Sequence, residues 1–157
     1  MPKTLTVNNT PYEYPTAGDE PGWGPEASGW AEEVTNVLNN ILGSDDILET
    51  SFNIANNQSS AADITGLVFN SATVRSAVVE YAVHRVSDSN PSGNSETGEM
   101  HVIYDGSSWS LSVGGVVGNS NVNFSITGAG QVQYTSNDIG SINYVGIIKF
   151  KARAISQ

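Results

Sequence analysis

The sequence contains no cysteine and only two histidines, His84 and His101, among its 157 residues. Without cysteine the chain forms neither a disulfide framework nor a thiolate metal site. Two histidines without an evident third ligand make a weak zinc site, so we interpret both as structural or solvent-facing residues. No serine lies in a Gly-x-Ser-x-Gly turn that would present a nucleophile to either histidine. The sequence therefore offers no metal site and no serine hydrolase site.

Long hydrophobic runs are also missing. The first 14 residues, MPKTLTVNNTPYEY, lack the apolar segment of a secretory signal, and no run approaches the length of a membrane-spanning helix. We expect a soluble protein that is made in the cytoplasm and has no membrane partner.

Basic residues are few, with 6 Lys and Arg against 16 Asp and Glu. Residues 1–50 hold nine acids and one base, a net charge of −8, whereas residues 51–157 hold seven acids and five bases, a net charge of −2. Phosphate-backbone binding needs clustered Lys and Arg, so we expect no nucleic-acid partner. The acidic first part either keeps the protein soluble or docks onto a basic surface.

Paired carboxylates do not indicate catalysis. Glu32 and Glu33 are adjacent on a predicted helix and point about 100° apart, so they cannot face each other across a glycosidic bond. Glu96 and Glu99 flank a predicted strand start and are expected to be exposed edge residues. The acids of 45–49 lack the spacing of an EF-hand, and we interpret them as a helix-to-strand connector rather than a calcium site. We expect no enzymatic activity and no cofactor.

A single helix is predicted over residues 25–42. Pro25 suits the first helical position, Glu26 favours the positive N-terminal end, and Gly43 suits the position just past the end. Apolar residues recur with helical spacing on one face, which predicts an amphipathic helix that needs a packing partner. This apolar stripe consists of Ala27, Trp30, Ala31, Val34, Val37, Leu38 and Ile41.

The residues before the helix predict an extended arm. Residues 4–7 and 11–14 are short β-prone runs, which suggest a small hairpin or an extended segment that pairs with its own domain or a neighbouring subunit. Trp23 follows in a Pro- and Gly-rich stretch, between Gly22 and Gly24. Its indole either folds back onto its own domain or anchors the chain to another protein.

Residues 44–157 alternate between β-prone runs and turn-forming residues. Short strands at this spacing, with no helix between them, predict an antiparallel β-sandwich, jelly-roll-like in type. The polar segment Ser87–Thr97 is predicted to be a loop, long enough to be mobile or to bind a ligand. We predict strands over residues 49–56, 63–69, 73–86, 98–104, 108–117, 121–127, 130–136 and 145–155.

Aromatic residues in these strands favour packing over sugar stacking, although a sugar-binding surface remains the alternative. The residues concerned are Tyr81, Tyr104, Trp109, Tyr134 and Tyr144. The fold class is thus mostly β: an antiparallel β-sandwich with one N-terminal helix and an extended N-terminal arm. The domain boundary lies between residues 1–43 and residues 44–157.

Two segments resemble structural proteins of tailed bacteriophages, including cyanobacterial and marine phages. The resemblance is carried by Tyr14-Pro15, Gly18-Asp19, Trp23-Gly24, Trp30-Ala31 and Val34-Thr35 in the first segment. In the second it is carried by residues 130–136, GQVQYTS, and residues 148–152, IKFKA.

This resemblance implies a virion component, either a module of a tail-fibre protein or a small separate protein. The chain lacks shaft repeats, a coiled coil and a large receptor-binding tip, which favours a capsid decoration protein or a tail-attached adaptor. The resemblance also implies that the partners are other virion proteins and that the chain forms a homo-oligomer, with a trimer favoured. A host surface glycan is the alternative partner. The residues predicted to form the interface are Tyr12, Tyr14, Trp23, Trp30, Val34, Leu38 and Ile41.

Overall fold

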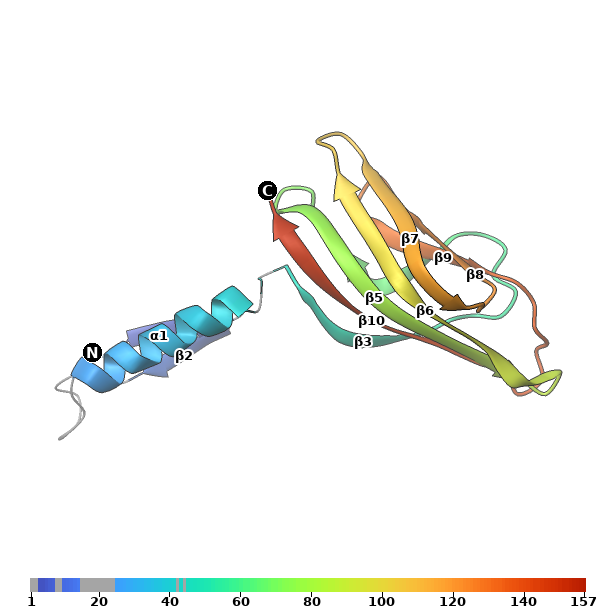
Figure 1. The fold of residues 1–157 in the computed structure, drawn as a ribbon, viewed down its shortest axis with the longest axis horizontal. Coiled ribbons are helices and arrows are strands. Elements are labelled where there is room, and N and C mark those ends of the chain that lie inside the picture. Colours follow the sequence, from blue (N-terminus) through green and yellow to red (C-terminus); the bar gives the residue numbers. More distant parts are fainter. Residues whose placement is uncertain (1–2, 8–9, 15–24, 42, 44) are drawn as a thin grey trace. The chain divides into compact units, whose positions relative to one another are not determined.

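The computed structural model describes residues 3–7, 10–14, 25–41, 43 and 45–157. The chain divides into two compact units, Met1–Ser44 and Asp45–Gln157. Figure 1 shows the hairpin and helix of the first unit and the two sheets of the second.

The N-terminal unit contains a hairpin and one helix. Strands β1 (Lys3–Val7) and β2 (Thr10–Tyr14) pair antiparallel, which is the hairpin arrangement that the sequence suggested. Helix α1 (Pro25–Ile41) lies against β1 and begins at the predicted proline. The last residue predicted to be helical, Leu42, lies outside the described residues. Within the described ranges, no helix combines the length and the apolar character needed to cross a membrane.

The C-terminal unit is a β-sandwich, which confirms the predicted fold class. A five-stranded antiparallel sheet has the order β3-β10-β5-β6-β7, and a three-stranded sheet has the order β4-β9-β8 (Figure 1). Its jelly-roll character stays a prediction. The strands are β3 (Ile47–Asn53), β4 (Ala62–Val68), β5 (Val74–Ser87), β6 (Asn90–Tyr104), β7 (Trp109–Gly118), β8 (Val122–Ile126), β9 (Gln131–Ser136) and β10 (Val145–Ser156).

The core lies between the two sheets because alternate residues of each strand point inward. On β5 the alternation is regular, with Val79, Tyr81 and Val83 buried and the residues between them exposed. Burial of these apolar side chains is the main source of sandwich stability. The largest fully buried apolar residues are Phe69, Phe150, Ile54, Ile64, Leu67, Met100, Ile148, Val74, Val79, Val102 and Val132.

The segment predicted as a loop, Ser87–Thr97, is instead a β-hairpin. Strand β5 continues to Ser87 and β6 begins at Asn90, so only two residues connect them. Pairing runs without a break from Thr97 opposite Ala82 to Asn94 opposite Arg85. The polar composition was misleading because residues 88–97 are exposed or half-buried, and exposed strand positions accept polar side chains.

A compact turn joins β6 to β7 through the carboxylate of Asp105. Its Oδ1 accepts hydrogen bonds from the backbone N–H groups of Ser107 and Ser108, at 2.8 Å each, and from the Ser107 hydroxyl at 2.9 Å. Hydrogen bonds to the ionised form favour that form. The bonds from Ser108 and Ser107 therefore lower the pKa of Asp105 from 3.8 to about 2.

We expect NMR titration of the Asp105 carboxyl to give a pKa of about 2 in the folded protein. Because the folded pKa lies below the unfolded one, the carboxylate stabilises the fold fully above about pH 4 and loses this effect as the pH falls through about 2. Asp105→Asn keeps the side-chain shape and removes the charge. The stability difference between wild type and this variant should therefore shrink in acid, and a difference independent of pH would contradict the assignment.

Candidate functional site

The predicted interface residues on α1 are largely uncovered in the N-terminal unit. Ala31 is buried, and Val34 is half-buried. By contrast, the side chain of Trp30 is 67% exposed, that of Val37 46% and that of Leu38 40%. The hairpin therefore covers only part of the apolar stripe.

The remaining predicted interface residues are not placed in the same detail. Tyr12 and Tyr14 lie in β2, and Ile41 is the last residue of α1, but their side chains are outside what the structure describes. Trp23 lies outside the described residues altogether. The candidate interface in the described part of the chain is thus the α1 stripe around Trp30 and Leu38.

A second candidate surface is the outer face of the five-stranded sheet. Antiparallel sheets with one solvated face normally show polar residues there. Here the face carries large exposed aliphatic side chains at both ends of its long strands. Its outward residues form cross-strand rows, and one such row is Ile155, Ser76, Ile103 and Ser110.

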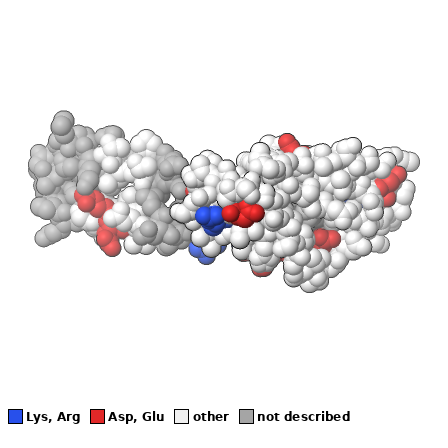
Figure 2. All heavy atoms as spheres, turned by 90° about the horizontal axis from the view of Figure 1, so that it is seen from above, with Lys and Arg blue, Asp and Glu red and all other residues white. Residues whose placement is uncertain are grey.

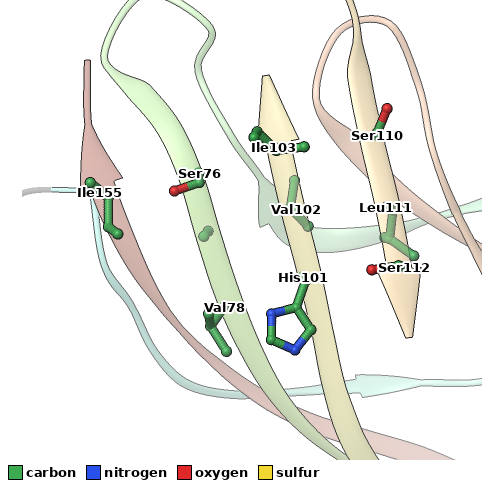
Figure 3. Close-up of a pocket in the computed structure, with 10 residues that line it drawn as sticks. Ser76, Val78, His101, Val102, Ile103, Ser110, Leu111, Ser112 and Ile155 are labelled. Carbon is green, nitrogen blue, oxygen red and sulfur yellow. The ribbon is translucent and has the colours of Figure 1, made fainter. Parts of the chain in front are cut away.

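At one end of this face lies a hollow of about 380 Å³, which we name the Ile103 hollow. Figure 3 shows that β10, β5, β6 and β7 all contribute to it, with Ile155, Val78 and Ile103 around small serine side chains. The hollow exists because the serine side chains are small, and the larger aliphatic side chains form its border. The only ionisable group among its lining residues is His101.

Toward the other end lies a larger, mostly apolar hollow of about 680 Å³, which we name the Val117 hollow. Ala82, Ile147 and Val117 line it together with polar residues of β6. His84 also lines it, and its Nδ1 lies 2.9 Å from the Ser95 hydroxyl. His84 and His101 thus lie in different hollows and do not form a shared site.

Charged residues lie between the two hollows and reach the edge of both, because Lys149 also lines the Val117 hollow and Arg153 lies opposite Val78 of the Ile103 hollow. We name as the charged band the bases Lys149, Lys151 and Arg153 of β10 with the acids Glu49, Glu80 and Glu99 of the other strands. Lys151 Nζ lies 2.9 Å from Glu80 Oε2, and Lys149 Nζ lies 3.6 Å from Glu49 Oε1. The band holds three bases and three acids and is balanced. In the view of Figure 2, the coloured part of the surface is mostly uncharged, with a few acidic and basic side chains.

Inside the sandwich, the guanidinium of Arg85 forms a site that the sequence did not reveal. Arg85 has no exposed surface, and all five of its N–H donors are used. Every acceptor is a neutral oxygen. Nε donates to the Tyr144 hydroxyl, Nη1 to the carbonyls of Ser120 and Asn121, and Nη2 to Asn56 Oδ1 and the Asn137 carbonyl, over 2.6 to 3.2 Å.

Two carboxylates are linked to Arg85 through one bridging residue each, Glu96 through Ser120 and Asp138 through Asn56. Glu96 accepts from the backbone N–H and hydroxyl of Ser120, and Asp138 accepts from the Asn56 side-chain amide. The pKa of Asp138 is lowered, first by the backbone N–H of Gly140 and then by Asn56. Glu96 was expected to be an exposed edge residue, but it is half-buried because its carboxylate faces this cluster.

Glu96 also accepts a hydrogen bond from the Tyr81 hydroxyl at 2.7 Å. Burial raises the pKa of Tyr81, and the hydrogen bond and the charge of Glu96 raise it further. Tyr81 therefore stays protonated as a structural donor. The buried positions of Tyr81, Trp109 and Tyr134 confirm the packing interpretation of these aromatic residues, and Tyr104 packs partly buried against the same core.

The other acids have structural contacts or remain on the surface. Asp45 accepts from the Thr73 hydroxyl and Asp46 from the Ala154 backbone N–H, so both hold the start of β3 to its neighbours. Across the described ranges, no three His, Asp or Glu side chains come together as a metal ion would require. Glu32 is half-buried and Glu33 is exposed on α1.

No protein-family model and no curated protein matches the chain. Among solved structures, the chain is similar to the tailspike protein of Acinetobacter phage vB_ApiP_P1, with a TM-score of 0.42 and 14% sequence identity. The match covers 71% of this chain and 22% of the tailspike chain. A likeness this distant does not indicate a function.

Replacing Arg85 with lysine should lower the free energy of unfolding by about 3 kcal/mol or more. An ammonium group has three donors at one point and cannot reach acceptors on several connections, so buried carbonyls are left unpaired. Denaturant unfolding of the full chain measures the change. The matched control is Arg153→Lys on the exposed face of β10, where we expect a change within about 0.5 kcal/mol. Equal effects of both substitutions would show that the hydrogen bonds of Arg85 contribute little.

Proposed function

We propose that this chain is a non-enzymatic structural protein of a phage virion and that residues 1–44 bind it to the particle. The virion assignment rests on the resemblance of the segments around Trp23, Trp30 and Gly130 to structural proteins of tailed phages. Under this proposal the chain is a capsid decoration protein or a tail-attached adaptor, and its partners are other virion proteins.

One observation carries the attachment role: part of the apolar stripe of the helix is uncovered, at Trp30, Val37 and Leu38. Large apolar groups that remain exposed together mark interaction sites, and tryptophan is the residue most often found at energetic centres of interfaces. Trp30 and Leu38 lie eight positions apart, close to two helical turns, on the same stripe. A groove or a second helix on the particle would bury them together.

The same stripe is also suited to contacts between copies of the chain, and we propose a homo-oligomer with a trimer as the favoured form. The N-terminal unit and the sandwich form separate compact units. This division allows one unit to make the attachment while the other presents its surfaces to neighbours.

The second candidate is a tail-fibre-type module that binds a host glycan or receptor. Four of the aromatic residues considered for sugar stacking pack in or against the sandwich core. The fifth, Tyr144, accepts a hydrogen bond from Arg85 and donates one to the Ile54 carbonyl. The segment Ser87–Thr97 is a paired hairpin rather than a loop. This candidate would therefore use another surface, and a glycan array with the full chain tests it.

Attachment is tested with Leu38→Asp and Trp30→Ala in the full chain. Each should weaken binding to purified virions at least about tenfold, because loss of a central apolar contact at an interface commonly costs more than about 1.4 kcal/mol. Co-sedimentation with virions measures the binding. The matched control is Asn36→Asp, which adds the same charge at an exposed polar position of α1. If Leu38→Asp binds as tightly as Asn36→Asp, the apolar stripe is not the attachment surface.

A further inference from the structure

We infer that the outer face of the five-stranded sheet is a contact surface for a second copy of this chain. This inference deepens the proposed homo-oligomer, on which it rests, by locating the contact in the sandwich rather than in the helix. Its elements are the Ile103 hollow, the Val117 hollow and the charged band between them.

Exposed aliphatic residues on this face gather around the two hollows. Val78, Ile103 and Ile155 border one hollow, and Ile147 and Val117 border the other. All five are among the exposed large hydrophobic residues of the described chain. Leaving such residues uncovered forgoes roughly 25 cal/mol for each Å² of apolar surface that burial would remove from water.

Charge favours another copy as the occupant. Of the net charge of −10, residues 1–50 carry −8 and residues 51–157 only −2, so two copies repel each other mainly through the first part of the chain. The charged band is balanced, and its bases and acids are segregated. The bases lie on β10, while Glu80 lies on β5 and Glu99 on β6. A surface with both signs on different strands can pair with itself.

The strand register makes this pairing specific. Lys151 lies opposite Glu80 on β5, and Glu80 lies opposite Glu99 on β6, so all three occupy one level along the strands. A rotation axis parallel to the strands keeps each level at the same height in every copy. It therefore brings Lys151 of one copy to the height of Glu80 and Glu99 of the next. The same rotation brings each hollow to the height of its counterpart.

The ion pairs within one chain do not prevent this exchange. Lys151 and Glu80 are each about half exposed, and Lys149 and Glu49 more than half. Exposed ion pairs contribute only about 0 to 1 kcal/mol. Their partners can therefore be exchanged between copies at little cost, while the aliphatic residues on either side become buried.

The first test compares Ile103→Lys with Val68→Lys in the full chain by analytical ultracentrifugation over a range of concentrations. The two native side chains are equally exposed, at 52% and 51%, but Val68 lies on β4 of the other sheet. We expect the wild type to self-associate and Ile103→Lys to weaken this association at least about tenfold, because a charge would face an apolar hollow. Val68→Lys should associate like the wild type. A monomeric wild type, or equal behaviour of the two variants, would overturn the inference.

The second test uses charge reversal and also detects a folding defect. Lys151→Glu and Glu80→Lys should each weaken self-association, and an equimolar mixture of the two variants should recover it. Recovery on mixing requires that the two side chains meet across copies, since a misfolded variant is not rescued by another chain. No recovery on mixing, with both variants folded by circular dichroism, would contradict the predicted charge pairing.

The outcomes separate this inference from the proposed attachment. If Leu38→Asp abolishes virion binding while Ile103→Lys associates like the wild type, the attachment role stands and the sheet contact is wrong. If Ile103→Lys weakens association while no form of the chain binds virions, the sheet contact stands and the attachment role is wrong.

Discussion

The buried guanidinium of Arg85 is the interaction on which one end of the sandwich depends. Strands β5, β6 and β10 have 14, 15 and 12 residues, whereas β4, β8 and β9 have 7, 5 and 6. The long sheet therefore has more inward-facing surface than the short sheet can cover. The part of this inward surface that the short sheet does not reach is covered by the connections between strands.

Such connections contain backbone groups that have no ladder partner. Buried carbonyls without a donor are costly, so a connection that packs against a sheet needs a source of hydrogen bonds. Arg85 is that source, since it bonds to the carbonyls of Ser120, Asn121 and Asn137 and to the side chains of Asn56 and Tyr144. One side chain thereby joins three separate connections to β5.

The charge of Arg85 is balanced indirectly. An unpaired buried charge is strongly unfavourable, and direct contact with a carboxylate is the usual remedy. Here Ser120 and Asn56 each bond to Arg85 and to a carboxylate, that of Glu96 or Asp138. The charges of Asp138 and Arg85 interact, which contributes to the lowered pKa of Asp138, while all five donors remain available for the connections. This arrangement fixes the loops more broadly than a direct salt bridge would.

Much of the fold follows from the sequence because its causes are local. Alternation of apolar and polar residues places all eight strands of the sandwich, and Pro25 and the apolar spacing place α1. The hairpin at Ser87–Thr97 was missed because its polar residues match those of a loop. Arg85 continues the inward series of Val79, Tyr81 and Val83, so its position was readable from the sequence. Its partners were not, because a backbone carbonyl has no signature in the residue type.

Whether an apolar stripe is covered is likewise a tertiary property. The sequence predicts which face of α1 is apolar, but only the structure shows Ala31 buried and Trp30 exposed. The same holds for the outer sheet face. Val78 and Ile103 are exposed there, although their neighbours Val79 and Val102, which are of the same residue type or similar, are buried.

Strand β5 connects the Arg85 cluster with the outer face of the five-stranded sheet. Its inward face includes Arg85. Its outward face carries Val78 at one hollow, Ala82 at the other and Glu80 between them. A broad outer face requires long strands, and long strands require cover for the inner surface that the short sheet does not reach. By fixing the connections that supply this cover, the guanidinium stabilises the extended sheet on which the candidate contact surface lies. The surface that we propose for a second copy thus depends on a hydrogen-bond cluster on the opposite side of the same strand.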